Sequence, residues 1–180
     1  MAGKMANPVD LYIKWFDDVS IKDVDMVGGK NASLGEMTSQ LSKYEIPIPP
    51  GFCTTSKAYW DHIKGSGLNF TIKSELKLLK EDSKKLYDVG RTIRRAISAA
   101  PLPPDLETSI CDYYQLLCER CGVENLAVAV RSSATAEDLP EASFAGVSIL
   151  KLLRYTANVV VEFCSLCLSL VISISNKRHI

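Results

Sequence analysis

A run of five apolar residues, Leu126 to Val130, ends at Arg131 and is followed by a long polar stretch of mostly small side chains. Apolar runs of this length are typical of buried strands, so the sequence predicts a strand that delivers a polar loop. An arginine that leaves a buried strand has a fixed backbone, and its planar guanidinium can hold phosphate oxygens at two points. The pattern also fits a surface loop in which Arg131 pairs with Asp138.

A second segment that points to phosphate chemistry is Gly28-Gly29-Lys30, directly before residues with helical periodicity that reach to about Tyr44. Glycines let backbone N–H groups approach an anion, the amino end of a helix is partially positive, and a lysine adds a full charge. The segment is not a P-loop, because the spaced glycines before the lysine and the hydroxyl residue after it are absent. On these residues alone, an ordinary turn with a solvated lysine is the simpler interpretation.

The remaining pattern predicts an α/β fold with several helices flanking a small mixed sheet. The first expected elements are an edge strand within residues 11–20 and an extended segment 46–52 with a turn at Pro50-Gly51. A short helix capped by Thr55 or Ser56 should follow and stop at residues 65–67. One or two helices are expected over 72–99, with a break near Asp82-Ser83, and another helix from Asp105 to Gly122. The apolar stripe of the 72–99 helices consists of Leu76, Leu79, Leu86, Val89, Ile93 and Ile97.

Charge and cysteine content narrow the class of protein further. Lys plus Arg and Asp plus Glu both number 21, which gives no reason to expect a nucleic acid or an anionic membrane as partner. The first residues contain no apolar leader, so we expect a cytoplasmic protein with reduced thiols. The pairs Cys118–Cys121 and Cys164–Cys167 have zinc-like spacing, but they lie in apolar surroundings without polar knuckles. We expect buried thiols there and no metal site.

Four segments then identify a family. They are Trp15-Phe16-Asp17, VGGKNASLGEM (27–37), IPIPPGFCTTSKAYW (46–60) and LAVAVRSSATAEDLPEASFAG (126–146). In this order, and with this spacing over residues 14–146, they resemble the nucleotide-binding domain of phosphoenolpyruvate synthases and pyruvate phosphate dikinases. The last segment is long and highly specific.

The resemblance implies the first lobe of an ATP-grasp domain, in which two lobes clamp the nucleotide. Lys30 should reach the ATP phosphates, Arg131 should bind the phosphoryl group being transferred, and Ser133, Ala134 and Thr135 should line the loop over the triphosphate. The implied reaction converts ATP, pyruvate and water to phosphoenolpyruvate, AMP and phosphate through a phosphohistidine. Alternatives are the same domain from a glucan-water dikinase or rifampin phosphotransferase, or a non-catalytic truncated product.

The resemblance also implies parts that this sequence does not contain. The acidic Mg²⁺ ligands are expected in the second lobe and pyruvate is expected to bind through further domains, so the isolated 180-residue chain is expected to be inactive. Neither His62 nor His179 fits the phosphohistidine carrier.

Residues 147–180 depart from the family pattern and form a divergent apolar tail. The run from Val159 to Ile174 is nearly all apolar, is shorter than a membrane span and carries Glu162 near its start. We expect a buried helix or strand there, and self-association through the tail if its partner surface is absent.

Overall fold

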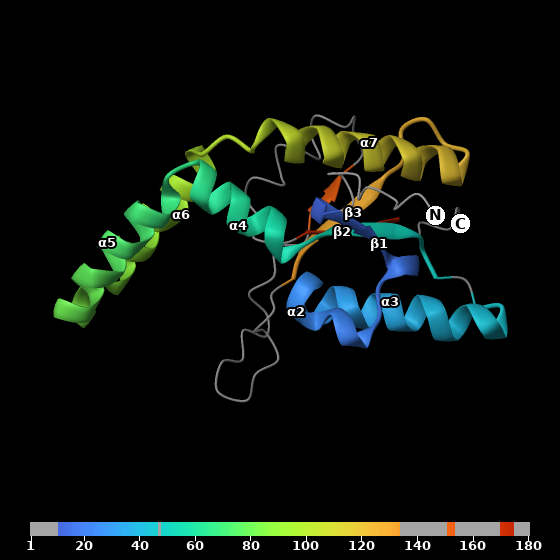
Figure 1. The fold of residues 1–180 in the computed structure, drawn as a ribbon, viewed down its shortest axis with the longest axis horizontal. Helices are drawn as coiled ribbons and strands as arrows, with labels where there is room; N and C mark the ends of the chain where they lie inside the picture. Colours follow the sequence, from blue (N-terminus) through green and yellow to red (C-terminus); the bar gives the residue numbers. More distant parts are fainter. Residues whose placement is uncertain (1–10, 47, 134–150, 154–169, 175–180) are drawn as a thin grey trace, which may run out of the picture.

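The computed structural model describes residues 11–46, 48–133, 151–153 and 170–174, in which a five-stranded sheet has helices on both faces (Figure 1). Strand order is β1-β2-β5-β3-β4. The strands are β1 (Ile13–Trp15), β2 (Gly51–Thr54), β3 (Val128–Ser132), β4 (Lys151–Leu153) and β5 (Leu170–Ile174). The helices are α2 (Val24–Val27), α3 (Gly29–Leu41), α4 (Ser56–Gly65), α5 (Leu68–Glu81), α6 (Leu86–Ala99) and α7 (Pro104–Cys121). The predicted α/β class is therefore confirmed.

All strand pairs of this sheet are antiparallel, so the prediction of a mixed sheet is wrong for the described strands. β2 and β3 run in the same direction, since each is antiparallel to β5. Parallel strands need a long crossover, and the chain between β2 and β3 is one, because it contains α4 to α7. Strands β2 and β3 do not pair with each other, however, because β5 lies between them and pairs antiparallel with both.

The central strand β5 comes from the end of the apolar run predicted over 159–174. Its Ser173 is opposite Gly51 of β2 on one side and Ala129 of β3 on the other. Residues 170–174 therefore supply the middle strand of the sheet. Residues 154–169, which hold most of that run, lie outside the described part of the structure.

Most predicted helix ends are confirmed. The helix after the glycine pair is α3, which continues as a 3-10 turn to Tyr44. The hydroxyl of Thr55 accepts a hydrogen bond from the Ala58 N–H at 3.4 Å and so caps α4. Gly122 ends α7 with φ of 65°, in the left-handed region that favours glycine. The helical region predicted over 72–99 is broken between Glu81 and Leu86, as expected.

Two boundaries differ from the prediction. The helix α5 begins at Leu68 rather than near residue 72, because Gly67 with φ of 71° ends the preceding turn and lets the helix begin at once. The turn expected at Pro50-Gly51 is replaced by extended chain, since Gly51 is the first residue of β2. β1 is an edge strand, as predicted, but it has only three residues.

Two apolar layers cover opposite faces of the sheet, and β2 contributes to both. All four β2 residues are buried, because neighbouring side chains in a strand point to opposite faces and both faces are covered. Phe52 lies in the layer beneath α7, whereas Cys53 lies in the layer over α2 and α3. The first layer includes Ile13, Trp15, Ile110, Tyr113, Leu117, Val128 and Val130. The second includes Phe16, Val19, Val27 and Ala32.

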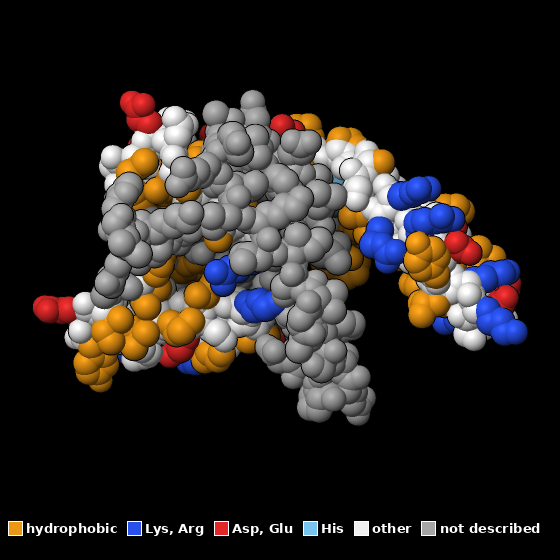
Figure 2. Space-filling view, turned by 180° about the vertical axis from the view of Figure 1, so that it is seen from behind, with side chains coloured by type: hydrophobic (Ala, Val, Ile, Leu, Met, Phe, Trp, Pro, Cys, Tyr) orange, Lys and Arg blue, Asp and Glu red, His pale blue; other side chains and the backbone are white. Residues whose placement is uncertain are grey.

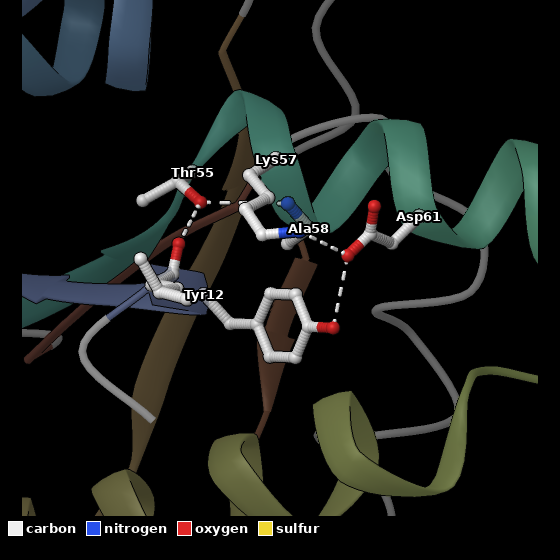
Figure 3. A network of polar contacts seen from close by, with 6 residues as sticks. Tyr12, Thr55, Lys57, Ala58 and Asp61 are labelled. Carbon is white, nitrogen blue, oxygen red and sulfur yellow. Dashed lines mark hydrogen bonds and ion pairs between the residues drawn. The ribbon is translucent and has the colours of Figure 1, made fainter. Parts of the chain in front are cut away.

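A polar network attaches helix α4 to the segment before β1 (Figure 3). The Thr55 hydroxyl donates to the Leu11 carbonyl at 2.6 Å, and the Tyr12 hydroxyl donates to Asp61 at 2.9 Å. Lys57 also donates to Asp61, at 2.6 Å, and this bond lowers the pKa of the Asp61 carboxyl. The network gives Thr55 and Lys57 of the third family segment a structural role, because together with Asp61 they anchor α4 beside the sheet edge.

The helical hairpin of α5 and α6 extends away from the sheet (Figure 1). In the apolar stripe of these helices, Val89 is buried and Leu76 and Leu86 are exposed. The other three residues, Leu79, Ile93 and Ile97, are half-buried. Lys and Arg side chains gather on the hairpin beside exposed apolar ones (Figure 2). The hairpin packs mainly on itself, which leaves part of the stripe exposed. None of the helices in the described residues is long and apolar enough to cross a membrane.

His62 of α4 gives the fold a dependence on pH. Its side chain is buried, neither ring nitrogen has a hydrogen-bond partner among the described residues, and burial lowers its pKa from 6.5. Below about pH 6.5 the unfolded chain takes up a proton that the folded chain resists. We therefore expect the free energy of unfolding to fall as pH decreases from about 7 to 5.

Urea unfolding at several pH values checks this expectation, with His62→Met as the comparison. The apolar variant should lose the pH dependence in this window and keep the one below about pH 4, where carboxyls such as Asp61 are protonated. An unchanged slope between pH 7 and 5 in His62→Met would contradict the assignment.

Candidate functional site

Gly28 makes the turn at which α2 ends and α3 begins. Its φ of 83° and ψ of 159° lie in a region of backbone conformation that is essentially restricted to glycine. The Gly28 N–H bonds the Val24 carbonyl, and the Gly28 carbonyl accepts the first bond of α3, from the Ala32 N–H at 3.0 Å. One residue therefore closes one helix and opens the next. The amino end of α3 is positioned by this glycine.

Lys30 is the second residue of α3 and is half-buried. The first turn of this helix contains no acidic side chain. The helix dipole and the lysine therefore add positive potential at the same end of α3. A negatively charged group is the ligand that such an end favours.

Arg131 lies within β3 rather than after it, which corrects the prediction of an arginine that leaves the strand. It is paired in register with Val171 of β5, so its backbone is held by the sheet. Val128 and Val130 pack in the layer beneath α7. Because side chains alternate along a strand, Ala129 and Arg131 face the layer that holds α2 and α3. The Arg131 side chain is exposed on that face.

A hydrogen bond joins the two predicted segments. The Ser133 hydroxyl donates to the Val27 carbonyl at 3.3 Å, across 106 residues of sequence. Val27 directly precedes the glycine pair, and Ser133 follows Arg131 by two positions. The structure thus brings the Gly28-Gly29-Lys30 turn to the end of β3. The other two predicted residues, Ala134 and Thr135, lie outside the described part of the chain.

Asn31 contributes to the same junction and was not predicted from the sequence. Its side chain is fully buried, and its Nδ2 donates to the Val27 carbonyl at 2.6 Å. The signal that could have revealed it is an asparagine on the side of the helix that also carries Ala32 and Gly35. Such a buried polar group needs a specific partner.

Gly35 is a second residue whose role the sequence did not reveal. A Cβ built at this position would lie 2.7 Å from the backbone carbonyl carbon of Val19 and would overlap its oxygen. Helix α3 therefore contacts the chain after β1 backbone to backbone. A glycine in the middle of a helix costs about 1 kcal/mol relative to alanine, so its occurrence there is itself a signal of close approach.

An open cavity of about 440 Å³ lies elsewhere, at the carboxyl end of α7. Tyr114, Gln115, Cys118, Glu119, Gly122, Val123, Glu124 and Asn125 line it. Since α7 covers the opposite face of the sheet from α3 (Figure 1), neither Lys30 nor Arg131 contributes to this cavity.

The four described cysteines are free thiols. Burial raises the pKa of Cys53 to about 12, so this thiol stays protonated at neutral pH. Cys118 is buried and Cys121 is half-buried at the end of α7. Within residues 11–46, 48–133, 151–153 and 170–174, no three His, Cys, Asp or Glu side chains are grouped so as to hold a metal ion. The pair Cys164 and Cys167 lies outside these ranges.

Comparison with known proteins gives the family of this site. Residues 24–178 match the model of the pyruvate phosphate dikinase AMP/ATP-binding domain. The chain belongs to this family. The resemblance predicted from the four sequence segments is thereby confirmed, and so is the class of nucleotide.

This chain is similar to several phosphoenolpyruvate synthases. It is 45% identical over 159 residues to a probable phosphoenolpyruvate synthase of Methanocaldococcus jannaschii, covering 88% of this chain and 13% of the relative. It is 41% identical over 175 residues to the phosphoenolpyruvate synthase of Synechocystis sp., and this match covers 93% of this chain and 21% of the relative. The enzyme of Neisseria meningitidis serogroup B is 46% identical over 138 residues, 76% of this chain and 17% of the relative. The chain thus spans about a fifth or less of these relatives.

Proposed function

We propose that this chain binds ATP between the amino end of α3 and the end of β3, as the nucleotide-binding part of a phosphoenolpyruvate synthase-type phosphotransferase. The observation that carries the proposal is the Ser133–Val27 hydrogen bond, which joins the segments that bear Lys30 and Arg131. The match to the AMP/ATP-binding domain family is the reason for proposing ATP as the ligand. The names of the relatives support phosphoenolpyruvate synthesis as the activity of the whole protein. ATP, pyruvate and water are the reactants that the family resemblance implies.

In this proposal Lys30 neutralises charge on the ATP phosphates, and Arg131 holds the phosphoryl group that is transferred. Phosphoryl transfer asks a protein mainly for positioning and charge neutralisation, and two cations on separate, fixed elements supply both. Ser133, Ala134 and Thr135 are proposed to line the loop over the triphosphate.

The proposed architecture is the first lobe of an ATP-grasp clamp. Two elements support it: a central sheet, and a glycine turn that aims the amino end of α3 at the cation-bearing strand. As the family resemblance implies, the proposal assigns the acidic ligands of Mg²⁺ to a second lobe and derives no step through the ion. Cytoplasmic location and self-association through residues 147–180 stay predictions.

ATP titration of the 180-residue chain, followed by NMR or calorimetry, tests the proposal. One lobe of a clamp should bind weakly, with a Kd on the order of millimolar, and binding should weaken with salt because its charges are exposed. Lys30→Ala and Arg131→Ala should each abolish measurable binding. The matched control is Lys43→Ala, since Lys43 lies just beyond the carboxyl end of α3 and bonds only Gln40 among the contacts described. Equal losses in all three variants would reject the proposed site.

Exchanges between lysine and arginine should distinguish the proposed roles of Arg131 and Lys30. We expect Arg131→Lys to weaken phosphate binding by about tenfold, because lysine cannot present two parallel donors from a fixed strand. Lys30→Arg should change it by less than about threefold, because main-chain amides and the helix dipole share the task at the end of α3. Measured affinities of both variants for inorganic pyrophosphate test this difference between the two exchanges. A larger loss in Lys30→Arg would reverse the two roles.

A further inference from the structure

We propose that Asn31 and Ser133 are positioning residues, which hold Lys30 and Arg131 in one fixed relation by sharing the carbonyl oxygen of Val27. The inference rests on the proposed function, because it takes Lys30 and Arg131 as the phosphate-binding pair. It concerns two side chains that need not touch the nucleotide themselves.

The Val27 carbonyl can hold both donors at once. A carbonyl oxygen has two lone pairs, and here it accepts from the Asn31 Nδ2 at 2.6 Å and from the Ser133 Oγ at 3.3 Å. The first bond stays within the α2–α3 segment, whereas the second comes from the end of β3. The two segments therefore meet at this carbonyl, and we call the hydrogen-bonded group of Val27, Asn31 and Ser133 the joint.

Burial makes this joint stiff. Val27, Asn31 and Ser133 are 1%, 0% and 3% exposed, so water cannot readily replace either donor. Hydrogen bonds in a buried setting are stronger and more directional than exposed ones. A loss of the Ser133 hydroxyl should leave the Val27 carbonyl with one donor and let the two segments shift relative to each other.

The joint lies next to both cations in sequence. Asn31 directly follows Lys30, and Ser133 lies two positions after Arg131, where strand alternation returns the side chain to the same face. Displacement of this joint therefore changes the separation of the ammonium and guanidinium groups. Simultaneous contact of both groups with one polyphosphate requires that separation to be fixed.

The experiment compares Ser133→Ala with Ser133→Thr in the 180-residue chain, with ATP affinity and urea stability as readouts. Ser133→Ala should weaken ATP binding about fivefold to tenfold, the scale of one buried hydrogen bond. Ser133→Thr keeps the hydroxyl and should stay within about twofold of the original affinity. Ser109→Ala is the control, because Ser109 is also buried and donates to a backbone carbonyl, that of Asp105 at 2.7 Å, but lies in α7. It should change stability alone.

A double-mutant cycle separates positioning from general destabilisation. In a background of Lys30→Arg, which still binds, the effect of Ser133→Ala should differ from its effect in the original chain by at least about threefold, because groups in one network are coupled. Additive effects, original affinity in Ser133→Ala, or an equal loss in Ser109→Ala would each overturn the inference. If Ser133→Ala does not fold, Ser133→Cys fills the same space with a weaker donor and takes its place.

Hydrogen exchange gives a readout that needs no nucleotide. Ser133→Ala should speed amide exchange in residues 28–31 and leave β1 and β2 unchanged. If the original chain does not bind ATP above the Lys30→Ala level, the proposed function fails, and exchange still decides whether the joint exists. Unchanged exchange in residues 28–31 overturns the joint itself.

Discussion

Gly35→Ala should lower the free energy of unfolding by about 3 kcal/mol, the upper range for an overpacked core position. The added Cβ would lie 2.7 Å from the Val19 carbonyl carbon, and this neighbour is backbone rather than a flexible side chain. Helix α3 would have to move away from the segment after β1. Because the amino end of α3 carries Lys30, the displacement should also weaken ATP binding. Urea unfolding and ATP titration of the same variant measure both effects.

Gly90→Ala is the matched control for this prediction. Gly90 also lies inside a helix, but a Cβ there would meet only the end of the Arg94 side chain, at 3.1 Å. Arg94 can move, so the usual gain of about 0.5–1 kcal/mol for replacing glycine in a helix should appear. A stabilised Gly35→Ala would show that α3 does not contact Val19 as described.

Sequence reasoning predicted those elements whose signals are local. The glycine turn that opens α3, the threonine cap of α4 and the glycine that ends α7 each act within one helical turn, and all three are confirmed. The antiparallel sheet was missed because β5 pairs with residues far from it in sequence. An apolar run in the sequence does not by itself predict which strands the segment will pair with. The exposed hairpin was missed for the related reason that an apolar stripe does not reveal whether a partner covers it.

The candidate site shows the same division. Lys30 and Arg131 were predicted from the chemistry of their own segments and from the family resemblance. The contact between those segments depends on Ser133 and Val27, which are 106 residues apart. Gly35 and Asn31 were not predicted either, since their roles depend on what α3 packs against. The sequence therefore yields the proposed phosphate-binding groups, whereas the contact between their two segments is seen only in the structure.

Phe52→Ala should cost about 3–5 kcal/mol of stability, as large aromatic truncations in a core do. Phe52 is fully buried in β2, with its ring 5.7 Å from that of Trp15 and 5.6 Å from that of Tyr113. These contacts attach α7 to the sheet, and truncation would leave a cavity between them. Thermal and urea unfolding measure the loss. The exposed Phe70 of α5 is the control, since Phe70→Ala should change stability by less than about 0.5 kcal/mol.

The position of Phe52 also predicts what this variant should leave intact. Its side chain lies on the α7 face of the sheet, whereas α3 and the Val27 joint lie on the other face. Under conditions in which Phe52→Ala stays folded, its affinity for ATP should therefore match that of the original chain within about twofold. Lys30→Ala should show the opposite result, with binding lost and stability nearly unchanged. If Phe52→Ala weakened ATP binding while folded, the two faces would be coupled through β2, and the site would depend on the whole sheet rather than on the α3 layer alone.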